Sequence, residues 1–383
     1  MTGRERFEAV INHKKPDKVP FYVPTFACSV ASAILGRPAL GGADSLHFKE
    51  EKARFLGDAA LEEFEGQYFE DTAAIARKLR IDITRETWRM RGKPDKMLDD
   101  NTLLFGDEHG EHIIKKFYPE TQSYGVVEDT RKQQTAEDII ELVKKRVNMP
   151  PPKADKDEAI AGMAGAKSIY DLLKDLDLGV LSRGWMPPMT LFDPAWLLAM
   201  ALAPELMAEY ALWGLDAAIG NMETLADMGY KWFCGGADLA SNTGPMFSPA
   251  LFETILTKPL KIYADACKNK GVVYSYATDG NIEIMFEAMF VKTGVMAFGE
   301  VDRDAGMTLA LVRERLPGVI VLGNMSSTLL ATGTPEEVYQ SQVRQLEESE
   351  GYDFIAGPSN AVVHGTPVAN IYAMIEAIDA FTP

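Results

Sequence analysis

The stretch YSYATDGN, which runs from Tyr274 to Asn281, carries the pattern that decides the fold. The apolar and aromatic side chains of residues 272–276 predict a buried strand, and the chain then turns at residues 278–281 before a helical run. In an α/β protein, ligands bind in the crevice at the carboxyl ends of the strands. An Asp-Gly-Asn corner there either places a carboxylate and an amide over a site or only turns the chain. The same unit of strand, polar corner and helix recurs along the sequence, and this recurrence favours the site.

Strand-like runs that alternate with helical runs indicate the α/β fold class. The strand-like runs are residues 18–24, 79–84, 179–185, 230–237, 272–276, 295–300, 318–323 and 352–356. The helical runs include residues 195–228, 249–270, 282–292, 309–316, 335–349 and 367–381. Eight strands with crossover helices predict a (β/α)8 TIM barrel. An open, doubly wound sheet shows the same alternation, but its Gly-x-Gly-x-x-Gly fingerprint after the first strand is missing.

One segment interrupts this alternation. The sequence LLFGDEHGEHIIKKFYPETQSYGVV, residues 103–127, alternates in the manner of three antiparallel strands joined by polar turns. An acidic helix at residues 136–146 and a proline-rich, charged loop at residues 150–157 follow it, and we interpret the loop as a surface linker. We therefore expect a single TIM-barrel domain over residues 1–383 with a small antiparallel insertion at about residues 103–127.

Composition excludes several classes of protein. The formal net charge of -17 argues against a surface that binds nucleic acid or an anionic membrane. No apolar run reaches the roughly 18 residues that a membrane-spanning helix needs, and the charged N-terminus does not resemble a signal peptide. The cysteines, Cys28, Cys234 and Cys267, are far apart and odd in number. This pattern argues against a disulfide framework, so we expect a cytoplasmic protein.

Motifs spread along the chain carry a family resemblance. GADLASNTGPMFSPALFETILTKPLKIYADACKNKG, residues 236–271, combines an acidic residue after a strand with Gly-Pro, Ser-Pro and Lys-Pro steps and a helix that ends in Lys-Asn-Lys-Gly. GRERFEAVINHKKPDKVPF, LFDPAWLLAMALAPE and GPSNAVVHGTPVANIYAMI occur in the matching order at the start, middle and end. The chain resembles the uroporphyrinogen decarboxylase family over nearly its whole length. The resemblance implies a TIM barrel, in agreement with the strand count.

The resemblance implies two chemistries, and departures from the family motifs bear on both. Porphyrinogen decarboxylases carry arginines just after the first strand that bind substrate carboxylates, whereas VPTFACSVASAILGRP has none before Arg37. Carboxylates left unpaired in a cleft are costly, which argues against a porphyrinogen substrate. The thiol-activating methyltransferases bind zinc through a His-x-Cys pair and a later Cys. In this chain Ala277 and Asp279 stand at the pair, and the later Cys falls near Ser359 and Asn360.

The remaining candidate site is rich in oxygen donors. The side chains for which we predict a catalytic role follow strands, where barrels place their active sites, and they are Asp238, Asp279, Glu300 and His364. Those for which we predict substrate contacts are Trp185, Arg183, Asn242, Tyr274, Tyr276, Asn324 and Asn360. We expect the four catalytic candidates to share one cavity, floored by one of the two tyrosines and walled by the tryptophan. A turn-forming role for Asp279 and a solvated loop position for His364 are the alternatives.

These residues and the resemblance together predict a corrinoid-dependent methyltransferase. It would move a methyl group from a small methoxylated or methylated compound to a corrinoid carried by a partner protein. His364, or a metal held by His364 and carboxylates, would assist the leaving atom. Zinc is the second cofactor consistent with the resemblance, although the chain lacks the Cys ligand set. The alternatives are a decarboxylase of a small acid, with Arg183 holding the substrate carboxylate, and a binding subunit without catalysis.

Overall fold

A seven-stranded parallel sheet forms the centre of the protein. The computed structural model describes residues 1–85, 87–162 and 176–383. The strands lie in the order in which they are named here: β1 (Ile83–Arg85), β6 (Gly179–Arg183), β7 (Trp232–Gly236), β10 (Val273–Ala277), β11 (Ala297–Gly299), β12 (Ile320–Leu322) and β13 (Phe354–Ile355). Each strand pairs in parallel with the next, as crossover helices require.

The segment predicted as the first strand, residues 18–24, closes this sheet into a barrel. Phe21 forms a parallel bridge with Ala356, just after β13, and Tyr22 forms one with Ile83 of β1. The Tyr22 amide donates to the Ala356 carbonyl at 2.9 Å, and the Ile83 amide donates to the Phe21 carbonyl at 3.2 Å. Because this segment pairs with both edge strands, the parallel pairing runs round the full circle. The predicted TIM-barrel fold is confirmed.

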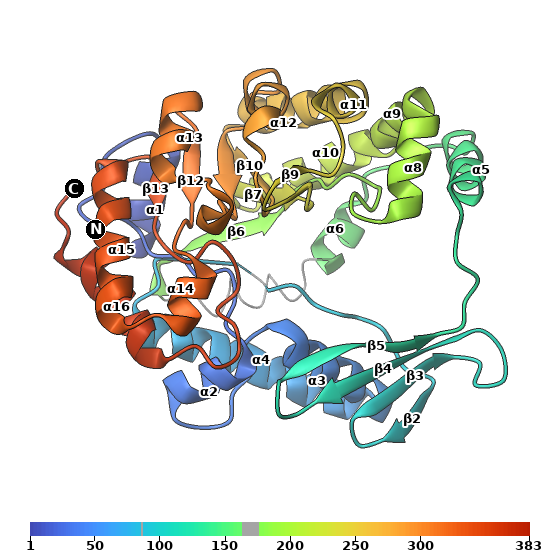
Figure 1. The fold of residues 1–383 in the computed structure, drawn as a ribbon, viewed down its shortest axis with the longest axis horizontal. Helices are drawn as coiled ribbons and strands as arrows, with labels where there is room; N and C mark the ends of the chain where they lie inside the picture. Colours follow the sequence, from blue (N-terminus) through green and yellow to red (C-terminus); the bar gives the residue numbers. More distant parts are fainter. Residues whose placement is uncertain (86, 163–175) are drawn as a thin grey trace.

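Helices surround the barrel (Figure 1). In the N-terminal half they are α1 (Gly3–Ile11), α2 (Cys28–Leu35), α3 (Ala43–Leu56), α4 (Asp58–Leu79), α5 (Ala136–Val147) and α6 (Lys156–Gly162). Next come α8 (Pro194–Leu202), α9 (Pro204–Leu212), α10 (Leu215–Asp227), α11 (Pro249–Phe252) and α12 (Lys258–Lys270). The last are α13 (Leu309–Arg315), α14 (Ser327–Thr332), α15 (Pro335–Ser349) and α16 (Val368–Ala380).

Helix α1 closes the end of the barrel at which the strands begin. Phe7 and Val10 of α1 belong to the apolar cluster that also contains Ile83, Trp232 and other strand residues. The rings of Phe7 and Trp232 lie 5.9 Å apart. A Cβ atom on Gly179, the first residue of β6, would lie 2.5 Å from the Phe7 ring, so only glycine allows this approach. The opposite end of the barrel, where the strands finish, is left for a site.

The structure corrects two helical predictions. The single helix predicted at residues 195–228 is three helices, because Pro204 begins a new helix and Gly214 adopts a φ of 82°. The run predicted at residues 282–292 consists of a 3-10 turn (Glu283–Met285) and a π-helical turn (Glu287–Val291). A second π-helical turn (Glu253–Thr257) joins α11 to α12, so the helix predicted at residues 249–270 is continuous.

The antiparallel insertion is larger than the sequence predicts. It is a four-stranded sheet of β2 (Lys96–Asp99), β3 (Thr102–Gly106), β4 (His112–Tyr118) and β5 (Ser123–Asp129). Strand β2 is almost fully exposed and lacks apolar alternation, which explains why the predicted boundary at residue 103 is wrong. The sheet packs on α3, where the rings of Phe48 and Phe117 stack with centroids 4.7 Å apart. A further small sheet pairs β8 (Ala240–Ser241) with β9 (Gly244–Pro245).

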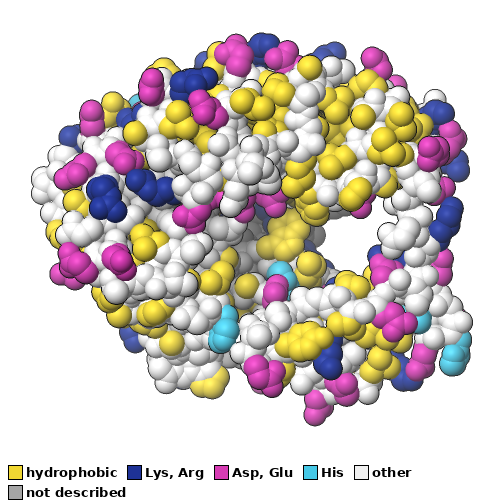
Figure 2. Space-filling view, in the orientation of Figure 1, with side chains coloured by type: hydrophobic (Ala, Val, Ile, Leu, Met, Phe, Trp, Pro, Cys, Tyr) yellow, Lys and Arg dark blue, Asp and Glu magenta, His cyan; other side chains and the backbone are white. Residues whose placement is uncertain are grey.

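The space between the antiparallel sheet and the helices is open. Figure 2 shows the molecule hollowed between the sheet β2–β5 and the helical layer above it. Acidic side chains are spread over this face, in keeping with the net charge of -17. Within the described residues, no single helix is both long and apolar enough to span a membrane. Residues 194–202 and 204–227 reach that length and composition only when joined, and they are bent by 107°.

Candidate active site

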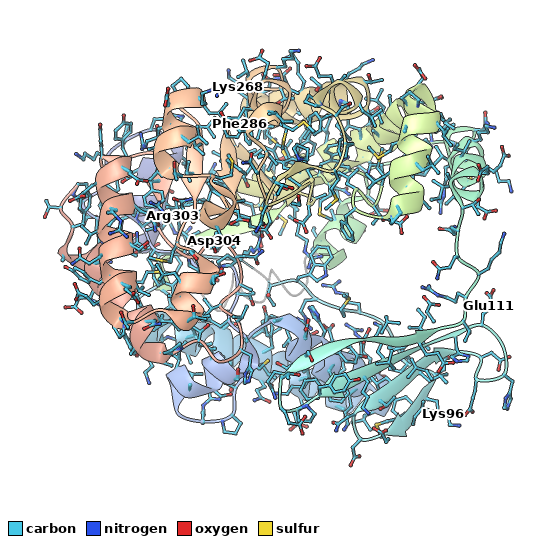
Figure 3. The ribbon with its side chains drawn as sticks, viewed as in Figure 1. Lys96, Glu111, Lys268, Phe286, Arg303 and Asp304 are labelled. Carbon is cyan, nitrogen blue, oxygen red and sulfur yellow. The ribbon has the colours of Figure 1, made fainter. Side chains whose placement is uncertain are left out.

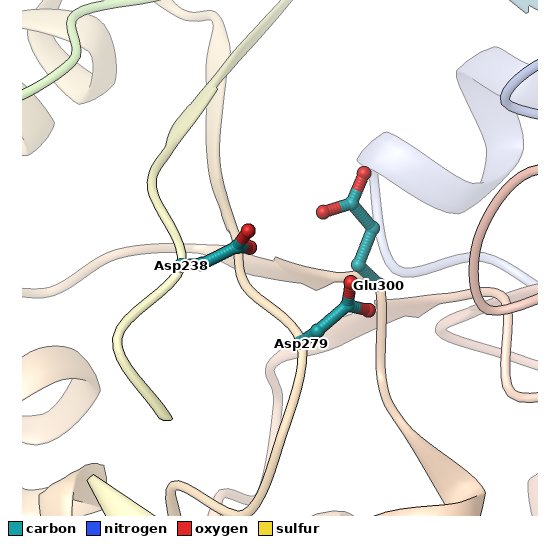
Figure 4. A group of neighbouring side chains, drawn as sticks. All are labelled: Asp238, Asp279 and Glu300. Atoms are coloured by element: carbon teal, nitrogen blue, oxygen red, sulfur yellow. The ribbon is translucent and has the colours of Figure 1, made fainter. Parts of the chain in front are cut away.

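Three carboxylates meet at the end of the barrel where the strands finish. Asp238 follows β7, Asp279 follows β10 and Glu300 follows β11, and these three strands are neighbours in the sheet. Ala277 at the end of β10 pairs with Gly236 and Gly299, so the three strands finish at the same level. One carboxylate oxygen from each side chain lies within 4.8 Å of the others. Figure 4 shows the three side chains converging from separate loops.

Backbone conformations bring these loops close together. Gly236 has a φ of 139°, and a Cβ atom there would lie 2.1 Å from the Ala277 carbonyl oxygen. The Thr278 hydroxyl accepts a hydrogen bond from the Leu239 amide at 3.1 Å, which ties the loop after β10 to the loop after β7. Glu300 has a φ of 61°, in the left-handed region, at a cost on the order of 1 kcal/mol for a residue other than glycine. Strain of this kind is concentrated at functional sites.

The surroundings of Asp279 favour its protonated form. Burial is the largest cause, and the nearby charges of Glu300 and Asp238 add to it, raising the pKa of Asp279 to about 7. A hydrogen bond from the Asn360 amide nitrogen to Asp279 Oδ2, 2.5 Å long, opposes this rise, and the charge of Asp302 adds slightly to it. Asp279 therefore exchanges its proton close to neutral pH, as a general acid requires.

Glu300 differs from Asp279 because it has a cationic partner. Arg85, the last residue of β1, places Nη2 3.5 Å from Glu300 Oε1. Burial raises the pKa of Glu300, and the Arg85 charge opposes that rise. The cluster thus has one carboxylate beside a cation and one, Asp279, that relieves the repulsion by holding a proton. Environments that separate the pKa values of neighbouring carboxyl groups are typical of acid–base sites.

The remaining predicted residues near the strand ends fall into two groups, and the first packs away from the site. Tyr274 and Tyr276 face the helical layer, whereas Ser275 between them faces the barrel interior and accepts a hydrogen bond from Trp232. The Tyr274 hydroxyl donates to the Trp185 carbonyl at 2.8 Å, and Trp185 is itself buried among the outer helices. Tyr274 and Trp185 therefore do not line the cavity as predicted, whereas Tyr276 lies close enough to Asp238 to interact with its charge. The side-chain period of two along β10 sends the tyrosines outward.

The prediction for Asn324 is also corrected. This residue is fully buried, and its amide nitrogen donates to the carbonyls of Val301 and Met307 at 3.1 Å and 2.8 Å. Its amide oxygen accepts from Arg303, which pairs with Glu348 at 3.3 Å. Arg303, labelled in Figure 3, begins the 3-10 turn (Arg303–Ala305) that follows β11. With both ends of its amide bonded to protein, Asn324 holds this loop in place and does not contact substrate.

The second group stays at the surface of the site region. Arg183, the last residue of β6, is exposed, and its guanidinium lies 5.8 Å from the ring of Trp88. Asn242 is exposed in the turn between β8 and β9. The side chain of Asn360 donates a hydrogen bond to Asp279. Its direct role is therefore to position this carboxyl group. Substrate contacts by Arg183 and Asn242 remain predictions.

The structure does not bring His364 into the carboxylate group. His364 is exposed on the loop after β13, and its Nδ1 lies 2.8 Å from the Ser29 hydroxyl of α2. Among the described side chains, the group with converging oxygens consists of Asp238, Asp279 and Glu300. His364 therefore does not join the carboxylate group, because its loop brings the ring to Ser29 of α2, and a cavity shared by all four residues stays a prediction.

This geometry predicts a small effect for His364→Ala. We expect turnover to change by less than about tenfold, since a positioned proton-transfer group contributes about 10²–10⁴-fold and His364 lies outside the cluster. Steady-state kinetics of the purified variant, with Ser29→Ala as the matched partner variant, provides the measurement. A loss of turnover above 10²-fold with an unchanged melting temperature would restore His364 as the acid.

Arg85 and Cys234 lie beside the carboxylate cluster, although the sequence did not indicate them as site residues. Arg85 contacts Glu300, and its Nη1 lies 3.8 Å from the sulfur of Cys234, which faces the barrel interior. The alternation of the strand contained the signal, because Arg85 lies two residues after Ile83 and so shares its inward direction. The predicted strand ended at residue 84, one residue too early.

The donor atoms do not fit the zinc site of the thiol-activating methyltransferases. That site uses sulfur ligands, whereas the group that converges in the described part of this chain has three carboxylates and neither Cys nor His. Oxygen donors alone suit a hard divalent cation such as Mg²⁺ or Mn²⁺. The amide oxygen of Asn360 accepts a hydrogen bond from the Ala361 amide at 2.6 Å. Because it is engaged in this bond, it does not serve as a further ligand for the cation.

Comparisons with known proteins agree with the fold and with the family resemblance. Residues 196–381, which contain all three carboxylates, match the uroporphyrinogen decarboxylase (URO-D) family model. The resemblance of this chain to the uroporphyrinogen decarboxylase family is therefore confirmed over residues 196–381. A uroporphyrinogen decarboxylase of Anaeromyxobacter dehalogenans is 31% identical over 123 residues, 31% of this chain and 33% of that protein. The match thus spans about a third of the relative's length.

A solved structure extends the agreement over the whole chain. A methyltransferase from Methanosarcina mazei superposes with a TM-score of 0.65 over 99% of this chain and 98% of that one. The two sequences are 15% identical, so the similarity establishes the shared fold. The resemblance to the uroporphyrinogen decarboxylase family and the barrel architecture therefore agree, and the reaction is argued from the site.

Proposed function

We propose that the protein is a methyltransferase that moves a methyl group from a small methoxylated or methylated compound to the cobalt of a corrinoid protein. The observation that carries the proposal is the convergence of Asp238, Asp279 and Glu300 where the barrel strands finish, in surroundings that raise the pKa of Asp279 to about 7. An alkoxide or phenoxide departs poorly without a proton or an electrophile. The similarity in fold to a methyltransferase is consistent with this reaction class.

Several residues of this chain have separate roles in the proposed methyl transfer. The bond between methyl carbon and oxygen breaks, and its electron pair stays on the oxygen, which takes the Asp279 proton. A reduced corrinoid supplies the two-electron nucleophile that accepts the methyl group. Asn360 fixes Asp279 by donating to Oδ2, and Glu300 keeps Arg85 at the cluster. Asp238, exposed at the mouth, adds negative charge that holds the proton on Asp279.

A decarboxylase of a small acid is the second candidate, and Arg85 is the observation that favours it. A guanidinium beside a protonated carboxyl can hold a substrate carboxylate while Asp279 protonates the carbanion that remains after carbon dioxide leaves. In either reaction the corrinoid protein or the small acid must enter at the strand ends, since α1 closes the other end.

The three cysteines are free, and we keep the cytoplasm as the proposed compartment.

The charge of the site predicts that uroporphyrinogen is not a substrate. Among the described residues, one of the three clustered carboxylates has an ion-pair partner, so a polycarboxylate would meet repulsion. We expect purified protein to form no coproporphyrinogen and to show no change in melting temperature when uroporphyrinogen is added. Chromatography of the reaction products measures this, with an authentic decarboxylase as the control. Turnover above the uncatalysed rate would remove the charge argument.

The proposal is tested by mixing the protein with a reduced corrinoid protein and a panel of methoxylated and methylated compounds. We expect the cobalt absorption spectrum to change from the reduced to the methylated form with at least one donor. Metal analysis of the same preparation separates a protonated Asp279 from a bound cation. Active protein with less than stoichiometric metal supports the proton, and activity that depends on added Mg²⁺ or Mn²⁺ argues against it.

A further inference from the structure

Arg85 is a cation inside the barrel whose hydrogen-bonding capacity is only partly used. It ends β1, two residues after Ile83, which lies in the interior apolar cluster. Its contacts are long: 3.5 Å to Glu300 Oε1 and 3.8 Å to the Cys234 sulfur, and its buried Nε has no hydrogen-bond partner among the described residues. The side chain keeps 25% of its surface exposed. A guanidinium has five N–H donors in a planar fork, and the Nε donor of Arg85 is one that no described residue satisfies.

Arg89, on the same stretch of chain as Arg85, is an arginine with a structural role. Arg89 has a side chain that is 1% exposed, with contacts of 2.6 Å to Glu50 and 2.7 Å to Glu65. Its guanidinium also lies 4.8 Å from the ring of Tyr68. Arg89 has two carboxylate partners at short distance, whereas Arg85 has one carboxylate partner at 3.5 Å. The contrast indicates that Arg85 is placed for a ligand rather than for stability.

We propose that Arg85 binds the oxygen atom from which the methyl group departs. The inference rests on the proposed methyl transfer and names its substrate class, an O-methyl compound. When the methyl–oxygen bond breaks, the electron pair stays on oxygen, and the guanidinium stabilises the charge that develops there before the oxygen is protonated. An ether oxygen is neutral before the step and anionic during it, so the contact strengthens toward the transition state. A quaternary amine departs uncharged and would gain nothing from Arg85.

The test separates binding of the product-like anion from methyl transfer itself. The probes are 2,4-dinitrophenolate, which carries a charged oxygen, and 2,4-dinitroanisole, the matched neutral methyl ether, both measured by calorimetry near pH 6. We expect Arg85→Gln to weaken phenolate binding by about tenfold or more and ether binding by less than about twofold. Arg85→Lys keeps the charge without the fork and should lie between the two.

Two control variants show whether fold or charge alone explains the effect. Arg131→Gln removes an arginine that pairs with Asp129 on the antiparallel sheet, and it should leave both dissociation constants unchanged. Arg89→Gln removes the arginine with two carboxylate partners, and it should lower the melting temperature more than Arg85→Gln does. In the transfer assay, Arg85→Gln should lower kcat/KM by about 10²–10³-fold, as the loss of one donor to a developing oxyanion does.

The outcomes distinguish this inference from the proposed function. Selective loss of phenolate binding with retained ether binding supports the role of Arg85, even if the wild-type protein transfers no methyl group to a corrinoid. Equal weakening of both probes in Arg85→Gln, or unchanged phenolate binding in a folded variant, overturns it. Methyl transfer by the wild-type protein that Arg85→Lys and Arg85→Gln leave intact overturns it as well, while the proposed function stands.

Discussion

Asp279→Asn is expected to abolish most methyl transfer and at the same time to stabilise the protein at alkaline pH. Turnover should fall by about 10²–10⁴-fold, since asparagine keeps the hydrogen bond from Asn360 but has no acidic proton. The pKa of Asp279, about 7, lies above its usual value, so the stability that its protonated form contributes is present at low pH. That stability is lost as pH rises through 7, when a charge appears in the buried cluster.

The stability effect of Asp279→Asn therefore has a defined pH window. At pH 8 the variant should melt about 1–3 °C above the wild-type protein, and at pH 3.8, the ordinary pKa of an aspartate, the difference should be close to zero. Calorimetry at both pH values measures the difference. Asp265→Asn, on the exposed face of α12 where Asp265 pairs with Lys261, controls for the loss of a carboxylate. Retained turnover, or a lower melting temperature at pH 8, would show that Asp279 is a structural turn residue.

The second large effect is expected in the pH dependence of kcat/KM. Because the acid form of Asp279 is required, kcat/KM should be constant below pH 7 and fall about tenfold for each unit above it. The groups that face Asp279 are Asp238, Glu300 and Asp302, with Arg85 beyond Glu300. Asp238→Asn removes one of these like charges, which lowers the pKa of Asp279 and moves the fall in kcat/KM to lower pH.

The pH profile is measured with a fixed concentration of reduced corrinoid protein whose own reactivity is checked across the same range. Thr243→Ala, in the exposed turn after β8, serves as the matched control, since it removes no charge. A profile that rises with pH would assign Asp279 the role of a base. A flat profile would remove proton transfer by Asp279 from the rate-limiting step and favour a cation at the cluster.

The barrel could be predicted because its signal is distributed along the chain. Each strand is an apolar run that ends in a polar corner, and the run at residues 272–276 is seen as β10 within one residue at each end. The run at residues 18–24 pairs only through Phe21 and Tyr22, because the prolines that flank these residues cannot extend the ladder. Short, exposed strands such as β2 give no such signal, and their extent becomes clear only in the folded sheet.

The site was predictable in part, and the errors have a common cause. Asp238, Asp279 and Glu300 each follow a predicted strand, and the closed barrel brings such positions to one end. The direction of a side chain depends on strand register, however, and one residue of uncertainty reverses the face. This explains both Tyr274, which points outward, and Arg85, which was left outside its strand. The position of His364 depends on a loop path that no sequence period encodes.

The reading of the protein as a binding subunit without catalysis is less consistent with these contacts. A barrel that had lost its chemistry would have no need to hold three carboxylate oxygens within 4.8 Å of one another or to place Glu300 in a left-handed conformation. Unfavourable charge and backbone strain are retained where a site uses them. The remaining choice lies between methyl transfer and decarboxylation, which move different carbon atoms of the same substrate.

The most direct measurement follows two carbon atoms at once. A methoxybenzoate labelled with carbon-13 in the methoxy group, and a second sample labelled in the carboxyl group, are each incubated with the protein and a reduced corrinoid protein. We predict that the methoxy label appears on the corrinoid as methyl-cobalt, detected by mass spectrometry, and that the carboxyl label stays in the released hydroxybenzoate. Release of labelled carbon dioxide without formation of methyl-cobalt would contradict the account. If Asp279→Asn also abolished that release, the site would be assigned to decarboxylation.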